Sequence, residues 1–151
     1  MVEEGQPAPD FELQTDGDET VSLSSFRGQP VVLYFYPKDD TPGCTAQACG
    51  IRDSFGEFRD RGAVVLGVSP DSVSSHVSFK EKYELPFTLL ADPEHEAAER
   101  YGVWVEKERE GKRYLGIERS TFVIDAEGNV AKVMRRVDPQ THADDVLAAL
   151  P

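Results

Sequence analysis

The chain has 151 residues, of which 39% are hydrophobic and 29% are charged, and its formal net charge at pH 7 is -12. This length suits one compact domain that folds without a disulfide or metal, and the negative charge argues against DNA or RNA binding. The longest apolar run, residues 31–36, is too short to cross a bilayer. No apolar signal segment is visible at the acidic N-terminus. We therefore expect a cytoplasmic protein with reduced thiols.

In chain order, the first expected feature is a β-hairpin close to the N-terminus. Residues 10–14 and 20–26 have strand-type sequences, and the polar residues 15–19 between them are typical of a turn. Residues 30–37 follow as a continuous apolar run bounded by prolines, which predicts a buried central strand.

The rest of the chain alternates predicted helices and strands. In order, these are helix 44–62, strand 63–69, helix 70–85, strand 86–92, helix 93–101, strands 119–125 and 130–137, and helix 142–150. The first helix places Ile51, Phe55 and Phe58 on one face. Asp92 is expected to be the N-cap of helix 93–101, and Gly102 is expected to stop it. Strands joined by helical crossovers indicate an α/β domain whose mixed central sheet is covered on both faces.

Both cysteines lie in the sequence TPGCTAQACG, residues 41–50, directly after the most apolar strand. In such sheets, function gathers at the C-terminal ends of the strands. Pro42 and Gly43 place Cys44 in the first helical turn, where free N–H groups and the helix dipole favour a thiolate. A helix end supplies about 0.3–1 kcal/mol, whereas ionising about 90% of an ordinary thiol at pH 7 requires about 3.4 kcal/mol. A fixed cation is therefore expected as well, and arginine suits this role because its fork can hold two oxygens and the sulfur.

The spacing from Cys44 to Cys49 sets a geometric condition. On one regular helix their Cα atoms are about 8.6 Å apart, whereas a disulfide needs about 7 Å or less. We therefore expect residues 44–50 to be helical when reduced and irregular when the two cysteines are bonded. Gly50 lowers the cost of this opening by about 1 kcal/mol relative to alanine.

Pro37, Thr41 and Cys44 form the pattern P-x-x-x-T-x-x-C, and Cys49 follows five residues later. This arrangement resembles the active-site signature of peroxiredoxins, in particular the Q-type branch, also called bacterioferritin comigratory proteins. The resemblance extends over nearly the whole chain, including the stretches GQPAPDFEL, PFTLLADPE and RSTFVID. Arg119 stands where this family has an arginine that completes the site. The resemblance implies one thioredoxin-like domain over residues 1–151, with an N-terminal β-hairpin.

The resemblance also implies a reaction cycle for hydrogen peroxide and organic hydroperoxides. Cys44 attacks the peroxide and becomes a sulfenic acid, Cys49 condenses with it to an intramolecular disulfide, and thioredoxin or a similar dithiol reduces the bridge. Thr41 and Arg119 would hold the peroxide oxygens, and Pro37 would shield the site. The cycle needs no metal or other cofactor. We expect a monomer, because the resolving cysteine lies in the same chain.

Several alternatives remain open for the cysteines. They could be plain buried apolar residues, or they could form a structural disulfide. They could also be metal ligands, but His76, His95 and His142, which could complete such a site, are all remote from them in sequence. A general thiol–disulfide oxidoreductase is the rival enzyme, although it usually has two residues between its cysteines. A non-enzymatic redox sensor that uses the same disulfide is the other rival.

Other residues have simpler interpretations. Without the family pattern, Thr41 would be a turn residue and Arg119 an exposed charge on a strand. Tyr101 and Trp104 are expected to pack in the interior rather than to contact substrate. The charged residues 107–110 are expected to form a solvated hairpin or loop.

Overall fold

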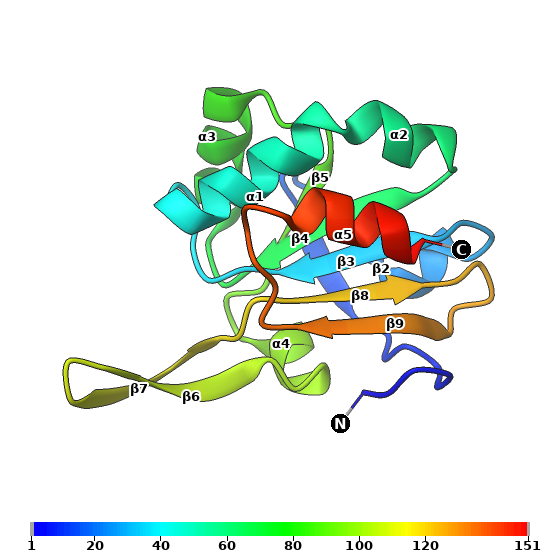
Figure 1. Cartoon of the computed structure of the whole chain (residues 1–151). Helices are drawn as coiled ribbons and strands as arrows, with labels where there is room; N and C mark the ends of the chain where they lie inside the picture. The colour runs from blue at the N-terminus through cyan, green and yellow to red at the C-terminus, as the bar shows by residue number, and fades with distance from the viewer. Residues whose placement is uncertain (1, 151) are drawn as a thin grey trace.

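A mixed β-sheet forms the centre of the computed structural model, which describes residues 2–150 (Figure 1). Within that range, seven strands lie in the order β2-β1-β5-β4-β3-β8-β9. Their bounds are β1 (Glu12–Thr15), β2 (Thr20–Ser22), β3 (Val31–Phe35), β4 (Val64–Ser69), β5 (Thr88–Ala91), β8 (Ser120–Ile124) and β9 (Val130–Arg135). The three central strands β3, β4 and β5 are parallel, and the other pairs are antiparallel. The predicted mixed sheet and N-terminal hairpin are confirmed.

Helices cover both faces of this sheet (Figure 1). The helices are α1 (Pro42–Asp53), α2 (Phe55–Asp60), α3 (Val73–Tyr83), α4 (Glu96–Arg100) and α5 (His142–Ala149). The first three and α5 lie over one face, whereas α4 lies on the opposite face. No helix within residues 2–150 is long and apolar enough to cross a membrane.

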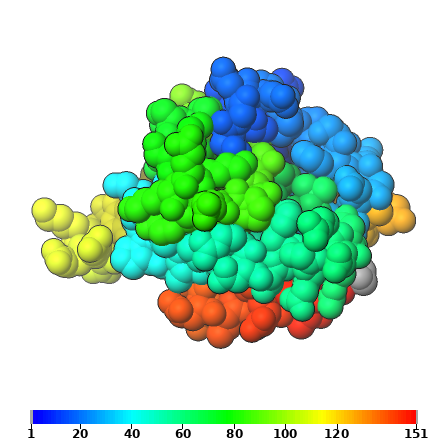
Figure 2. All heavy atoms as spheres, turned by 90° about the horizontal axis from the view of Figure 1, so that it is seen from above, coloured from blue at the N-terminus to red at the C-terminus, as the bar shows by residue number. Residues whose placement is uncertain are grey.

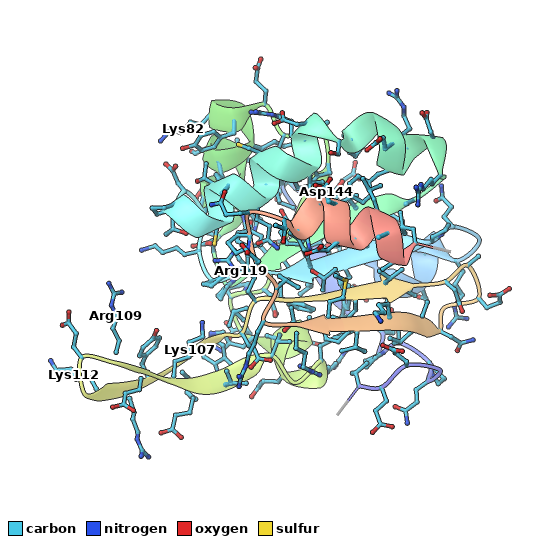
Figure 3. All side chains as sticks on the ribbon, viewed as in Figure 1. Lys82, Lys107, Arg109, Lys112, Arg119 and Asp144 are labelled. Atoms are coloured by element: carbon cyan, nitrogen blue, oxygen red, sulfur yellow. The ribbon has the colours of Figure 1, made fainter. Side chains whose placement is uncertain are left out.

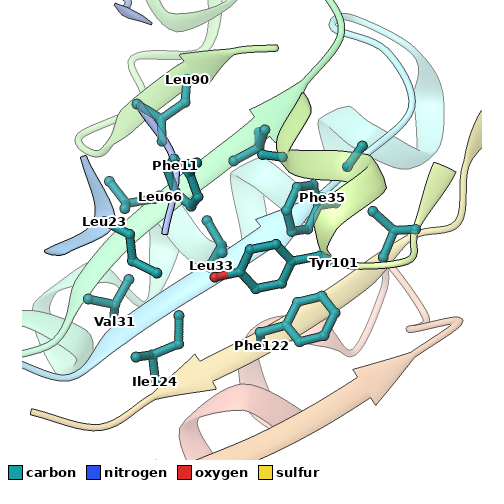
Figure 4. Close-up of a cluster of buried hydrophobic side chains, with 14 of the residues drawn as sticks. Phe11, Leu23, Val31, Leu33, Phe35, Leu66, Leu90, Tyr101, Phe122 and Ile124 are labelled. Carbon is teal, nitrogen blue, oxygen red and sulfur yellow. The ribbon is translucent and has the colours of Figure 1, made fainter. Parts of the chain in front are cut away.

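The fully buried strand β3 divides the interior into two hydrophobic clusters. Val31, Leu33 and Phe35 point into the cluster beneath α4 (Figure 4), whereas Val32 and Tyr34 point into the cluster beneath α1 and α5. Strand side chains alternate between the two faces of a sheet, so an apolar run in β3 supplies both clusters. This packing fixes the C-terminal end of β3, from which the cysteine-containing segment continues.

Two expected elements differ in the structure. Residues Leu23–Phe26 form a 3-10 helix instead of continuing a strand, since Asp10 Oδ1 accepts the N–H of Ser24 at 3.0 Å and turns the chain. The expected single helix 44–62 begins at Pro42 and breaks at Ser54, whose backbone (φ -103°, ψ 9°) leaves the helical region. The break turns α2 so that Phe58 is fully buried.

Asp92 caps α4, but not from the predicted position. The N–H of Asp92 still bonds to Ser69 O at 2.9 Å, which holds Asp92 beside the C-terminal end of β4. Helix α4 therefore begins at Glu96, after His95, and the Asp92 carboxylate reaches forward to accept the N–H of Ala98 at 3.0 Å. The expected stop at Gly102 is confirmed by its positive φ of 69°.

A second β-hairpin lies between α4 and β8, where the expected order of elements has no strands. Its strands β6 (Trp104–Arg109) and β7 (Lys112–Ile117) pair with each other and form a separate two-stranded sheet. The hairpin projects from the body of the protein (Figures 1 and 2). Residues 107–110, expected to form a solvated hairpin or loop, belong to a hairpin whose strands extend well beyond them.

Candidate active site

Cys44 lies in the first turn of α1, as expected, and it is buried. Pro42 opens the helix, because a proline at this position loses no helical hydrogen bond. Arg119, in the short link between β7 and β8, donates through Nη1 to Cys44 Sγ at 3.4 Å. The structure thus brings the predicted cation to the predicted thiol across a separation of 75 residues.

Thr41 and Pro37 precede Cys44 in the segment that leads from β3 into α1. Thr41 is the N-cap residue of α1, but its hydroxyl makes no capping bond and donates instead to Lys38 O at 2.8 Å. Since this bond uses the hydroxyl proton, the free lone pairs of Thr41 Oγ1 remain as acceptors. Pro37 and Thr41 both line an open cleft of about 390 Å³ beside the hairpin.

Cys49 lies on the same helix as Cys44, further along and half-buried, and both cysteines are free. Helix α1 is continuous from Pro42 to Asp53, so the predicted helix across residues 44–50 is confirmed for the reduced protein. At ideal helical geometry the two Cα atoms are about 8.6 Å apart. The two cysteines therefore cannot form a disulfide with each other as long as this helix is intact.

Gln47 is a site residue that we did not predict. It is fully buried, and its Oε1 accepts from Arg119 Nη1 at 2.7 Å. This bond holds the guanidinium in place against the sulfur. Gln47 lies three residues after Cys44, and this spacing puts both side chains on one face of a helix. That spacing is the sequence signal by which Gln47 could have been found.

The loop between β3 and α1 is anchored by a buried carboxylate, Asp39. This carboxylate accepts from Tyr36 Oη at 2.6 Å and Ser75 Oγ at 2.8 Å, and it contacts His76 Nδ1 at 2.7 Å. The other ring nitrogen of His76 faces Leu90 O at 2.9 Å. Both ring nitrogens therefore have partners, which fix the ring between the Asp39 carboxylate and the backbone of Leu90. The loop that carries Thr41 is thus tied to α3 and β5.

Asp39, His76 and Asp71 lie close enough to share a cation, but their atoms already bond to one another and to the protein. Asp71 Oδ2 accepts the N–H of Asp39 at 2.8 Å and the hydroxyl of Ser69 at 2.6 Å. These contacts describe a hydrogen-bonded anchor rather than an open metal site. No cysteine belongs to this cluster.

The β6–β7 hairpin forms the far wall of the cleft. Trp104, Lys107 and Tyr114 line it opposite Pro37 and Thr41. Burial lowers the pKa of Lys107, and the nearby Arg119 charge lowers it further, whereas Cys44 acts in the opposite direction. Lys107 therefore lies within electrostatic range of the thiol. Tyr101 is fully buried as predicted, whereas Trp104 packs against the core and also faces the cleft.

His142 and Tyr34 are buried beneath α1. Burial lowers the pKa of His142 to about 4, and His142 Nε2 lies 2.6 Å from Thr121 Oγ1. Burial likewise raises the pKa of Tyr34 well above its usual value. Both groups are therefore neutral near pH 7, whereas Arg119, which bonds to Cys44 Sγ, is charged.

The sequence matches the model of the AhpC/TSA family over residues 4–133. It is 53% identical to a putative peroxiredoxin bcp of Coxiella burnetii, with 99% of each chain covered. It is also 54% identical to peroxiredoxin Bcp of Bacillus subtilis, over 99% of this chain and 95% of that protein.

Solved structures agree with these similarities. The bacterioferritin comigratory protein of Xanthomonas campestris matches with a TM-score of 0.88 and 42% identity, over 92% of this chain and 88% of that chain. Xylella fastidiosa PrxQ matches with a TM-score of 0.93 and 34% identity, over 98% of this chain and 94% of that chain. The predicted thioredoxin-like fold is confirmed. With sequence, fold and motif in agreement, the chain belongs to the AhpC/TSA family, among peroxiredoxins of the bacterioferritin comigratory, or Q, type.

Proposed function

We propose that this peroxiredoxin reduces hydrogen peroxide and organic hydroperoxides through Cys44, forms an intramolecular bridge with Cys49, and is recycled by a thioredoxin-type dithiol protein. The observation that carries the proposal is the bond from Arg119 Nη1 to Cys44 Sγ at 3.4 Å, in the first turn of the helix whose N-cap residue is Thr41. The Xanthomonas protein is described as having alkyl peroxide reduction activity. This description supports organic hydroperoxides as substrates here.

In the first step, the Cys44 thiolate attacks the terminal oxygen of the hydroperoxide. The S–O bond forms while the O–O bond breaks, Cys44 becomes a sulfenic acid, and the leaving oxygen takes a proton and departs as alcohol or water. Arg119 stabilises the charge that moves from the sulfur to the leaving oxygen. Thr41 Oγ1 accepts the hydroperoxide O–H, because its own proton is bonded to Lys38 O.

In the second step, the Cys49 sulfur attacks Cys44 Sγ. The S–S bond forms, the S–O bond breaks, and the hydroxyl leaves as water with the proton of Cys49. A dithiol partner then reduces the bridge by two exchange reactions and is itself oxidised to a disulfide. One chain supplies both cysteines, which is consistent with a monomer and a single functional domain.

Mass spectrometry and thiol counting after one equivalent of hydrogen peroxide test this cycle. The native protein should lose both thiols and gain no oxygen, whereas Cys49→Ser should retain one added oxygen on Cys44. Cys44→Ser should lose all peroxidase activity and remain folded. Peroxide turnover in the Cys44→Ser variant would refute the assignment of Cys44.

Steady-state turnover separates this function from its rivals. A peroxidase consumes many equivalents of peroxide when thioredoxin is supplied. A general thiol–disulfide oxidoreductase would exchange disulfides on protein substrates without fast peroxide consumption. A redox sensor would be oxidised once and would then bind a partner.

A further inference from the structure

The β6–β7 hairpin separates its charges onto two faces. Side chains alternate along each strand, so the pairs Lys107–Tyr114 and Arg109–Lys112 lie on one face. We call these four residues the cationic face. The opposite face carries Glu106 and Glu108 with Arg113, and Arg113 forms an ion pair with Glu106 at 3.3 Å.

The cations of this face are free to bind a partner. Lys107, Arg109 and Lys112 form no ion pair within residues 2–150. In Figure 3, Lys107 and Arg109 extend from the hairpin on the side of Arg119. Tyr114, which is 46% exposed, adds an apolar surface opposite Lys107 on the neighbouring strand. Such a surface is unusual on a chain with a net charge of -12.

The length of the hairpin favours a large partner over a small peroxide. At about 3.4 Å per residue, the five steps from Ile117 to Lys112 carry the tip roughly 17 Å from the body. A hydroperoxide at Cys44 needs only Arg119 and Thr41. Contact with both the site and the tip of the hairpin requires a body of protein size.

We propose that the cationic face is the docking surface for the protein that reduces the Cys44–Cys49 disulfide, and that this partner carries acidic residues beside its dithiol. The inference depends on the proposed recycling step. The net negative charge of the chain otherwise repels an acidic protein, so a local cationic face is needed to steer it to the site. On docking, one partner thiolate attacks a sulfur of the disulfide and the other sulfur leaves as a thiolate. The second partner thiol then attacks the mixed disulfide. This protein leaves with both thiols reduced, and the partner's two cysteines form a disulfide.

The test compares two charge reversals on opposite faces of the same hairpin, Arg109→Glu and Arg113→Glu. Each changes the net charge equally, so Arg113→Glu is the matched control. The oxidised proteins are mixed with a reduced thioredoxin of negative net charge or with neutral dithiothreitol, and the fluorescence of Trp104 is followed by stopped flow. We expect Arg109→Glu to lower the ratio of the thioredoxin rate to the dithiothreitol rate roughly fivefold at low salt. Arg113→Glu should stay within about twofold of the native ratio.

Salt provides a second readout. At about 0.5 M NaCl the difference between the two variants should nearly disappear, because the Debye length falls to a few ångströms. Equal ratios in both variants, or a deficit that persists at high salt, would overturn the proposal. If Arg109→Glu slowed the oxidation of Cys44 by peroxide as much as it slows reduction by thioredoxin, the face would instead serve an anionic peroxide. A native protein that forms no disulfide would refute the proposed function itself, which is a different result from an unaffected ratio.

Discussion

Formation of the Cys44–Cys49 disulfide should unwind the first turns of α1. The helix is continuous from Pro42 to Asp53 in the reduced protein. Five residues of helix rise by about 7.5 Å and separate the two Cα atoms by about 8.6 Å. A disulfide needs about 7 Å or less, so the chain must close by at least about 1.6 Å, which a regular helix does not permit.

The structure sets the extent of this opening. Opening residues 44–50 breaks the backbone bonds that these residues donate and those that they accept. The first of these bonds joins Thr45 N–H to Thr41 O, and the last joins Ser54 N–H to Gly50 O. About ten amides therefore lose their helical hydrogen bonds. Arg52 holds the end of the helix through Tyr83 O at 2.8 Å, so the opening should stop there.

Hydrogen exchange followed by mass spectrometry measures this change directly. We expect exchange at these amides to accelerate at least about a hundredfold in the disulfide form, while the central sheet keeps its protection. Cys49→Ser treated with one equivalent of peroxide is the control, because Cys44 is then oxidised without a bridge and α1 should remain protected. Equal protection of α1 in the reduced and disulfide forms would refute the reasoning.

Three further predictions follow from the contacts of single residues. Arg119→Met should slow the peroxide step at least about a hundredfold, and raising the pH to about 9 should not restore it; full recovery would limit Arg119 to ionising the thiol. Gly50→Ala should slow disulfide formation about fivefold, because alanine stabilises the helix by about 1 kcal/mol relative to glycine. The added Cβ fits without a clash, at 3.8 Å from Ala143 Cβ. An unchanged rate of disulfide formation in stopped flow would contradict this. Burial lowers the pKa of His142 to about 4, so the unfolded chain binds the proton first as the pH falls below 6.5. Between pH 7 and pH 5, the free energy of unfolding measured with denaturant should fall by about 2 kcal/mol more in the native protein than in His142→Gln. Equal decreases in the two proteins would contradict this.

The local part of the site was predictable because its residues are close together in the sequence. Pro37, Thr41, Cys44 and Cys49 all lie between the end of a buried strand and the middle of one helix. Strand pattern, turn chemistry and helix polarity place this segment without knowledge of the rest of the fold, whereas the roles of Pro37 and Thr41 came from the family pattern. Arg119 is 75 residues away from Cys44, and only the family pattern pointed to it.

Other features depend on tertiary contacts that leave no local pattern. The strands β6 and β7 are rich in charged residues and lack an alternating apolar pattern, because the hairpin projects from the body. Hydrophobic periodicity therefore does not detect them. His76 is fully buried, but its sequence context is that of a polar helix. Its role depends on Asp39, a residue from another element.

The anchoring of Asp39 determines which part of the site moves in the proposed cycle. The loop that ends at Thr41 is held by four contacts to its carboxylate and backbone, whereas the first turns of α1 have to open. The boundary between the fixed and the moving chain therefore lies at Pro42 and Gly43. After each reduction the helix refolds onto a loop that has not moved, so Thr41 is already in position when Cys44 returns. Loss of this anchor would slow every turnover, because the loop would no longer hold Thr41 in position for the returning helix.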